Sequence, residues 1–147
     1  MANVSRARAT WEGTLVAGSG TVSATSSSVF TDLPISWSSR TQAHNGKTSP
    51  EELVASAHAS CFAMALSHGL AQANTPAQRL EVEAAVTFGQ ADGGWRVVSS
   101  ALTVRGTVPG LDADGFRKAA EAAKDGCPIS QMMKGNVELS VDASLAG

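Results

Sequence analysis

Residues 48–66 read TSPEELVASAHASCFAMAL and contain the clearest helix start in the sequence. Ser49 supplies a capping hydroxyl, Pro50 fits the first helical position, and two glutamates follow in the first turn. Together, Ser49 and Glu52 match the pattern of a capping box. We predict a helix that continues to about Gln72. Its apolar residues are spread around much of the circumference, so we expect this helix to be buried on most sides.

The residues before this helix predict short strands. Residues 10–26 alternate loosely and contain three glycines, a pattern typical of two short strands joined by a turn. Residues 33–41, LPISWSSRT, are predicted to form a further strand, with Ile35 and Trp37 on one face and serines on the other. The polar residues 42–49 are predicted to form a loop.

The residues after the helix predict a hairpin, two helices and a final strand. Residues 80–88 alternate as a strand, and residues 95–108 follow as its partner after a turn with the sequence DGG. Asp112 is expected to cap a second helix, and Pro128 to open a further short one. Residues 136–143 alternate again and are predicted to close the domain as a strand.

Length and composition agree with one small domain. A chain of 147 residues is long enough for a single core. The order of elements predicts one α+β domain over residues 1–147, with helices packed on an antiparallel sheet. Charged residues make up only 16% of the chain, which indicates apolar surface hidden in a further interface. The net charge of −2 points to neither a nucleic-acid nor a membrane-surface partner.

The sequence indicates a cytoplasmic protein. Residues 1–12 lack the apolar run of a signal peptide. The longest apolar stretch, residues 53–73, is interrupted by serines, histidines and a glutamine, so we interpret it as a buried helix and not as a membrane span. In a reducing cytosol, two cysteines are more typical of redox or metal chemistry than of a structural disulfide. An inert pair of buried thiols is the alternative.

Cys61 lies inside the long predicted helix, and Cys127 lies at a junction between two helices. A single cysteine on a buried helix is most often a packing residue. Cys127 precedes Pro128 at a predicted helix start, where free amide groups and the helix dipole stabilise a thiolate. An ordinary cap position would explain it equally well. The two cysteines are far apart in the sequence, and their spacing does not show whether they meet.

Arg40 and Glu51 are candidates for activating a cysteine. Arg40 ends the third predicted strand, where a surface role would suffice to explain it. Placed near a cysteine, its guanidinium would hold a thiolate and bind the outer oxygen of a peroxide. Glu51 favours the helix dipole as an acid of the first turn, and could also orient Arg40 through a bidentate ion pair.

His58 allows a different interpretation. His58 and Cys61 are three residues apart and face one side of the helix, and with Cys127 and another histidine they could ligate zinc. No C-x-x-C or H-x-x-x-H pair supports such a site. The sequence also lacks the G-x-G-x-x-G, P-loop and G-x-S-x-G motifs, which argues against nucleotide cofactors and against a serine hydrolase.

Four segments together resemble the OsmC/Ohr family of hydroperoxide reductases. Residues 48–66 resemble the central helix of that family, and GCPIS at residues 126–130 resembles its second cysteine segment. The segments WEG at residues 11–13 and VPGLD at residues 108–112 also fit. The likeness covers nearly the whole chain.

Within the family, HASC at residues 58–61 and Arg40 before the helix favour the OsmC branch over the organic hydroperoxide resistance (Ohr) branch. The resemblance implies a cytoplasmic homodimer in which antiparallel sheets wrap around long central helices of two intertwined chains. It also implies that Cys61 is the peroxidatic thiol and Cys127 the resolving thiol, with Arg40 and Glu51 as the activating pair.

From this resemblance we expect a two-cysteine peroxidase with no bound cofactor or metal. A Cys61 thiolate would reduce an organic hydroperoxide to an alcohol and become a sulfenic acid, and Cys127 would then close a disulfide. An external dithiol, for which the family points to a lipoylated protein, would restore both thiols. Phe62, Met64 and Leu66 are available to line an apolar pocket, so we expect hydrogen peroxide to be the poorer substrate.

Two alternatives stay open beside the peroxidase. One is a protein without turnover that binds an apolar ligand or a metal through His58, Cys61 and Cys127. The other is a purely structural dimer whose cysteines never pair.

The spacing of Glu51 and Cys61 predicts a shared site. They are ten residues apart on one helix, which is about 15 Å along its axis. An arginine paired with Glu51 would sit poorly over Cys61 of the same helix. Two such helices packed antiparallel would bring the first turn of one beside the middle of the other. We therefore expect Arg40 and Glu51 of one chain to serve Cys61 of its partner.

Overall fold

The computed structural model describes residues 1–146, which fall into two compact units, Met1–Leu53 and Val54–Gly147. The long helix α2 (Pro50–Gln72) begins in the first unit and continues in the second. Each unit is described by itself below. One domain over residues 1–147 stays a prediction from the sequence.

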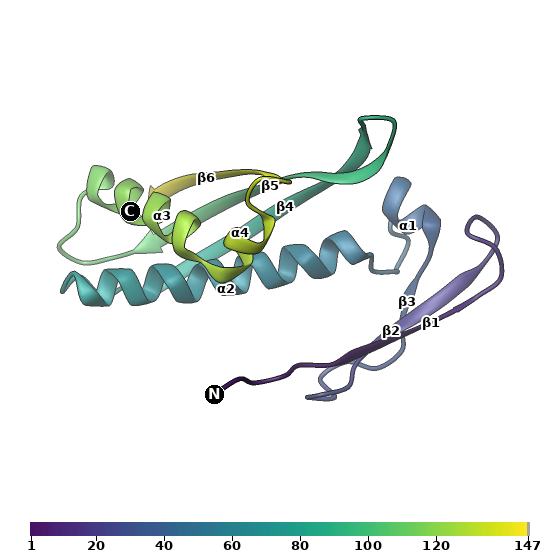
Figure 1. Cartoon of the computed structure of the whole chain (residues 1–147). Helices are drawn as coiled ribbons and strands as arrows, with labels where there is room; N and C mark the ends of the chain where they lie inside the picture. Colours follow the sequence, from purple (N-terminus) through teal and green to yellow (C-terminus); the bar gives the residue numbers. More distant parts are fainter. Residues whose placement is uncertain (147) are drawn as a thin grey trace. The chain divides into compact units, whose positions relative to one another are not determined.

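The first unit contains a three-stranded antiparallel sheet of order β1-β2-β3. Its strands are β1 (Ala7–Glu12), β2 (Ser19–Ala24) and β3 (Leu33–Ile35). The β1–β2 hairpin, purple in Figure 1, confirms the two strands predicted within residues 10–26. Polar residues follow β3, and the isolated bridge between Ile35 and Thr48 brings the chain back to the sheet before α2 begins.

The predicted strand over residues 33–41 is correct only as far as Ile35. From there the chain turns into a short helix, α1 (Trp37–Thr41). The buried Ser36 and Ser39 form a reciprocal capping box, in which the Ser36 hydroxyl accepts from the Ser39 amide and the Ser39 hydroxyl accepts from the Ser36 amide. Arg40 therefore lies in the last turn of α1 and not at the end of a strand, as we had expected.

Helix α2 begins and ends where the sequence predicts. The Ser49 hydroxyl accepts from the Glu52 amide at 3.1 Å, which is the expected N-cap bond. The Glu52 carboxylate accepts a hydrogen bond from the Thr48 hydroxyl at 2.6 Å, so residues on both sides of Pro50 fix the start of the helix.

Only one face of α2 is buried within the chain. His58, Phe62, Leu66 and Leu70, at four-residue spacing, are at most 1% exposed, whereas Met64 is 68% exposed. The expectation that the helix is buried on most sides is therefore wrong for a single chain, because the second unit covers only the His58–Leu70 face. Although α2 is long and apolar enough to cross a membrane by length and composition, its buried residues pack into the core of the second unit, as in a core helix.

The second unit contains a three-stranded sheet of order β4-β5-β6. Its strands are β4 (Arg79–Ala91), β5 (Gly94–Thr107) and β6 (Glu138–Leu145). The β4–β5 hairpin is antiparallel, as predicted, but β6 pairs with β5 in parallel. The antiparallel sheet that we predict is confirmed for β4 and β5, and β6 departs from it. Two helices connect β5 to β6 and return the chain to the same end of the sheet, which a parallel pair requires.

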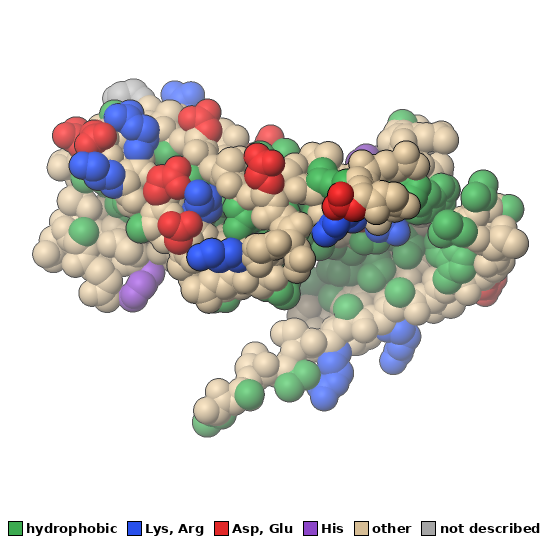
Figure 2. All heavy atoms as spheres, turned by 45° about the horizontal axis from the view of Figure 1, so that its top comes forward, with side chains coloured by type: hydrophobic (Ala, Val, Ile, Leu, Met, Phe, Trp, Pro, Cys, Tyr) green, Lys and Arg blue, Asp and Glu red, His purple; other side chains and the backbone are tan. Residues whose placement is uncertain are grey.

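The connecting helices are α3 (Ala113–Gly126) and α4 (Pro128–Met133). Asp112 caps α3, and its carboxylate accepts from the Gly115 amide at 2.7 Å. Figure 2 shows acidic and basic side chains interspersed on the side of the molecule that carries α3, where Arg117, Lys118 and Lys124 pair with acids of the same helix. The opposite face of α3 is apolar, so the helix is amphipathic.

The core lies between one face of the sheet and the helices. Alternate residues of β5, from Ser100 to Gly106, are buried on this face, and Figure 1 shows α2 running along it. The ring of Phe116 from α3 packs directly over Gly106, where an added Cβ would lie 2.6 Å from a ring carbon. This face of the sheet also carries the residues that surround the cysteines.

Candidate active site

Folding of the second unit brings the two cysteines together. Cys61 comes from the middle of α2, and Cys127 sits between α3 and α4, where it ends one helix and caps the next. Their Sγ atoms lie 2.9 Å apart, and both residues are free thiols. Cys61 is partly exposed and Cys127 is fully buried. The sequence spacing left open whether the two sulfurs meet, and in the structure they do.

Cys127 lies beside Cys61, and its thiol donates a hydrogen bond to the Cys61 sulfur. Burial raises the pKa of the Cys127 thiol, whereas the polar groups of Cys61, Ser130 and Ile129 lower it, and the net shift is downward. The structure confirms the cap position predicted from Gly126 and Pro128, because Cys127 ends α3 and is the N-cap residue of α4.

The pKa of the Cys61 thiol is raised above its ordinary value. Burial, and then the hydrogen bond with Cys127, raise the pKa of the Cys61 thiol, although the Ile129 amide acts against both. Cys61 is the more accessible of the two thiols.

A buried histidine joins the site through two serines. His58 Nδ1 lies 2.6 Å from Ser100 Oγ on β5, and His58 Nε2 lies 2.7 Å from Ser130 Oγ on α4. All three residues are at most 1% exposed. Burial lowers the pKa of His58, so its ring is neutral at neutral pH.

The zinc interpretation of His58 finds no ligand set. Both ring nitrogens already have hydroxyl partners. Among residues 1–146, no three histidine, cysteine, aspartate or glutamate side chains are grouped so that they could hold a metal ion. The partners of His58 are hydroxyls and not metal ligands. Ser130 lies in the GCPIS segment, which could have drawn attention to it, whereas nothing in the sequence marks Ser100.

Arg40 and Glu51 form a bidentate ion pair in the first unit. Arg40 Nε lies 2.9 Å from Glu51 Oε1, and Nη2 lies 3.1 Å from Oε2. The side chain of Glu51 is 8% exposed and that of Arg40 is 29% exposed. The guanidinium carbon also lies 5.7 Å from the centre of the Trp37 ring, a cation–π arrangement. The carboxylate and the ring hold the guanidinium in one orientation.

A cavity of about 230 Å³ opens beside this guanidinium. It is lined by Trp11, Leu15, Ile35, Ser36, Trp37, Arg40 and Pro50. Most of these side chains are apolar and Arg40 carries the positive charge, so the cavity suits a ligand with an apolar body and a polar or anionic end. The sequence had not indicated that Trp11 or Leu15 would line a cavity.

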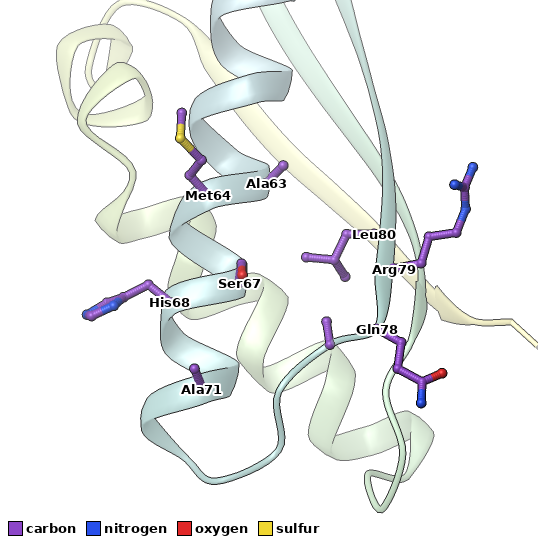
Figure 3. A pocket seen from close by; sticks show the side chains of 9 residues that line it. Ala63, Met64, Ser67, His68, Ala71, Gln78, Arg79 and Leu80 are labelled. Carbon is purple, nitrogen blue, oxygen red and sulfur yellow. The ribbon is translucent and has the colours of Figure 1, made fainter.

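A second cavity, of about 470 Å³, lies along α2 in the second unit. Figure 3 shows Ala63 of α2 on the side of Leu80, whereas the side chains of Met64 and His68 extend from the helix away from Leu80. Of the three residues expected to line an apolar pocket, Met64 borders this cavity, whereas Phe62 and Leu66 are fully buried in the core.

Comparisons with known proteins agree with this architecture. Peroxiredoxin OsmC of Escherichia coli (strain K12) is 39% identical over 134 residues, which cover 91% of this chain and 92% of that protein. The organic hydroperoxide resistance protein of Xanthomonas axonopodis pv. citri (strain 306) is 30% identical over 96 residues, or 64% of this chain and 65% of that protein.

A solved structure and a family profile extend the comparison. The crystal structure of the organic hydroperoxide resistance protein OhrB of Bacillus subtilis superposes with a TM-score of 0.73 at 26% identity, and covers 95% of this chain and 98% of that one. Residues 43–142 match the family described as OsmC-like protein. These residues include both cysteines, and the chain therefore belongs to the OsmC-like protein family.

Proposed function

We propose that this protein is a thiol-dependent peroxidase that reduces organic hydroperoxides to alcohols. The observation that carries the proposal is the 2.9 Å separation of the two free thiols, Cys61 and Cys127, within one chain. Relatives named peroxiredoxin and organic hydroperoxide resistance protein support a peroxidase-type role.

The unequal exposure of the two cysteines supports their roles. Cys61, which is partly exposed, attacks the outer oxygen of the hydroperoxide; the O–O bond breaks, an alcohol leaves, and Cys61 becomes a sulfenic acid. Cys127 is fully buried and lies beside this sulfur, so it attacks the sulfenic sulfur, expels the oxygen as water and closes a disulfide. The disulfide protects Cys61 from further oxidation.

The reaction needs Cys61 as a thiolate, yet its own unit raises the pKa of this thiol. Arg40, oriented by Glu51, is the cation that we propose for Cys61. In our proposal the protein is a homodimer, and Arg40 and Glu51 of one chain serve Cys61 of its partner. The exposed face of α2 carries Met64, which is 68% exposed, among small and polar residues, and it is the surface that a second chain would cover in this proposal.

Substrate and reductant follow from the same features. The cavity beside Arg40 offers two tryptophans to an alkyl or aromatic group, which favours organic hydroperoxides over hydrogen peroxide. An external dithiol, such as a lipoyl group on another protein, returns the disulfide to two thiols in the cytoplasm. In this scheme the protein uses no bound cofactor or metal.

A thiol count tests the proposal directly. Reduced protein is treated with one equivalent of cumene hydroperoxide per chain, and thiols are counted under denaturing conditions before and after. We expect both thiols to disappear together with formation of one intrachain disulfide, and dihydrolipoamide to restore them. A protein that only binds an apolar ligand, or a structural dimer, would keep both thiols, and that result would contradict the proposal.

A further inference from the structure

Two contacts, one helical turn apart, join α2 to α4. Cys61 Sγ lies 2.9 Å from the Sγ atom of Cys127, the N-cap residue of α4. One turn earlier on the same face of α2, His58 Nε2 lies 2.7 Å from Ser130 Oγ, which comes one turn after the cap. The proposed peroxidase chemistry uses the contact between the sulfurs and assigns no task to the contact between His58 and Ser130.

The ring of His58 is held at both nitrogens. His58 Nδ1 lies 2.6 Å from Ser100 Oγ on β5, so the ring cannot turn without losing a hydrogen bond. His58, Ser100 and Ser130 are at most 1% exposed, and a buried polar group left without its partner is costly. The hydrogen bond to His58 therefore ties Ser130 to α2 and, through the ring, to the sheet.

Helix α4 is short and depends on its attachments. Of its six residues, Pro128–Met133, only Ser130 and Met133 are buried, and a helix of this length is not stable in water by itself. It follows α3 through the single residue Cys127, whose backbone is extended (φ −61°, ψ 126°), so rotation at this residue would change the direction of α4. A bond at Ser130 restrains that rotation, and with it movement of Cys127 away from Cys61.

The bond to Ser130 matters most when the protein is reduced. In the oxidised protein, a disulfide between Cys61 and Cys127 would itself tie α4 to α2. In the reduced protein both cysteines are free thiols, and a thiol is only a weak donor and a weak acceptor of hydrogen bonds. The contact between the two sulfurs then depends on what else holds α4 in place.

We propose that His58 and Ser130 are positioning residues whose hydrogen bond holds α4 in place and keeps Cys127 beside Cys61 while both thiols are reduced. Ser100 supports this bond by fixing the ring of His58. Groups fixed at contact distance react with each other at a high effective concentration. The effect on the pairing of the thiols is independent of peroxide, whereas its benefit for turnover, disulfide closure before further oxidation of Cys61, rests on the proposed function.

Amide hydrogen exchange of the reduced full-length protein measures how firmly α4 is held. The amides of Gln131 and Lys134 report on it, because they donate to the carbonyls of Cys127 and Ser130. In Ser130→Ala we expect both amides to exchange about tenfold faster than in the wild type, as for loss of one buried hydrogen bond. In the oxidised protein the disulfide should remove most of this difference. Equal exchange rates in the reduced wild type and in reduced Ser130→Ala would overturn the proposal.

Two polar replacements of His58 separate the bond to Ser130 from the bond to Ser100. Glutamine and asparagine carry the same amide group, but that of glutamine lies one methylene further from the backbone. His58→Gln can therefore reach Ser130 as Nε2 does, whereas His58→Asn reaches only as far as Nδ1. We expect exchange in α4 to stay near the wild-type rate in His58→Gln and to rise about tenfold in His58→Asn. If the two variants behaved alike, the bond to Ser130 would have no positioning role.

Equilibration with glutathione measures the pairing of the two thiols without peroxide. Two glutathione molecules reduce the Cys61–Cys127 disulfide, pass their thiol protons to the two cysteines and become glutathione disulfide. The ratio of oxidised to reduced protein gives the effective concentration of the two thiols, which we expect to fall about tenfold in Ser130→Ala. Ser39→Ala removes a similarly buried serine hydroxyl in the first unit and should leave this concentration unchanged. An unchanged effective concentration in Ser130→Ala would contradict the proposal.

The wild-type protein gives a test that does not depend on whether a variant folds. In the reduced wild type we expect the amides of Gln131 and Lys134 to be protected from exchange. Exchange as fast as in an unfolded chain would overturn the proposal, because α4 would then be free whenever the disulfide is open. None of these experiments uses peroxide, so a protein with the expected exchange and thiol pairing but no peroxidase activity would remove the proposed function and leave this inference standing.

Discussion

Arg40 Nε donates a hydrogen bond to Glu51 Oε1 at 2.9 Å, and the side chain of Glu51 is 8% exposed. Two parallel contacts and the Trp37 ring fix the guanidinium plane, a geometry that a lysine ammonium does not reproduce. A single substitution of Arg40 can therefore be followed both in the free energy of unfolding and in the peroxidase activity.

Arg40→Lys should lower both the free energy of unfolding and kcat/KM. Losing one hydrogen bond to a charged group costs about 1.5 kcal/mol of unfolding free energy, and the same loss in the transition state lowers kcat/KM about tenfold. Urea unfolding and peroxide consumption with dihydrolipoamide measure the two effects. Arg79→Lys is the matched control, because the Arg79–Glu81 pair is more than 60% exposed on both sides and should contribute little. Unchanged kcat/KM in Arg40→Lys would remove Arg40 from the proposed site.

Cys127→Ser should react once with peroxide and then show little further turnover. Without a resolving thiol the Cys61 sulfenic acid persists and oxidises further to sulfinic or sulfonic acid, which mass spectrometry of the treated protein detects. Cys61→Ser is the companion variant, and we expect it to fold and to consume no peroxide. Sustained normal turnover by Cys127→Ser would show that another thiol resolves the sulfenic acid.

Gly106→Ala should destabilise the second unit without touching either cysteine. The added Cβ would lie 2.6 Å from the Phe116 ring and 3.0 Å from Leu80, and Phe116 is fully buried, so the core has no room for it. We expect a loss of about 1–3 kcal/mol in unfolding free energy. Gly89→Ala on β4 meets no atom within 4 Å and is the control, which should lose far less. Equal unfolding free energies for the two variants would contradict the packing described here.

Acid should destabilise the wild type more than His58→Gln. Burial lowers the folded-state pKa of His58 below its ordinary value of 6.5, so between these two values the unfolded state binds a proton and the folded state does not. Stability falls as pH drops through that window, with a slope of at most about 1.4 kcal/mol per pH unit, and the effect is absent above the unfolded pKa. Urea unfolding at about pH 7.5 and about pH 5.5 should show that the difference between wild type and His58→Gln narrows on acidification. A constant difference would mean that His58 titrates normally.

The parts of the fold that the sequence predicted well depend on local interactions. Ser49 and Pro50 fix the start of α2, and Asp112 fixes that of α3, through bonds that span only a few residues. The error at α1 has a local cause too. Ser36 and Ser39 match a capping pattern, but the alternation of Ile35, Ser36, Trp37 and Ser38 is also typical of a strand.

What the sequence did not predict depends on distant contacts. The alternation in β6 indicates a strand but not its direction. The parallel pairing with β5 depends on the path of the chain through α3 and α4, which the alternation does not predict. The partners of His58 are 42 and 72 residues away, and no spacing rule connects them. The meeting of Cys61 with Cys127 was likewise left open by spacing, and came only from the resemblance.

Mixing two inactive variants tests whether each site is shared between chains. Cys61→Ser lacks the attacking thiol, and Arg40→Ala lacks the cation that we propose for it. Along α2, Glu51 precedes Cys61 by ten residues, about 15 Å of helical rise, so an ion pair at the first turn suits the middle of an antiparallel partner helix better than its own. If sites are shared, a heterodimer contains one site with both Arg40 and Cys61 intact. We therefore expect peroxidase activity to return when subunits exchange, to at most half of the wild-type activity for each heterodimer.

The design of the mixture decides how the result is interpreted. Differently tagged chains allow the heterodimer to be purified and its activity to be expressed per dimer, so incomplete exchange does not enter the comparison. A mixture of Cys61→Ser with the double variant Cys61→Ser/Arg40→Ala is the control, since it contains no intact Cys61 and should stay inactive. Purified heterodimers of the two single variants that show no activity would place each complete site within one chain. The proposed partnership of Arg40 with the partner's Cys61 would then be wrong.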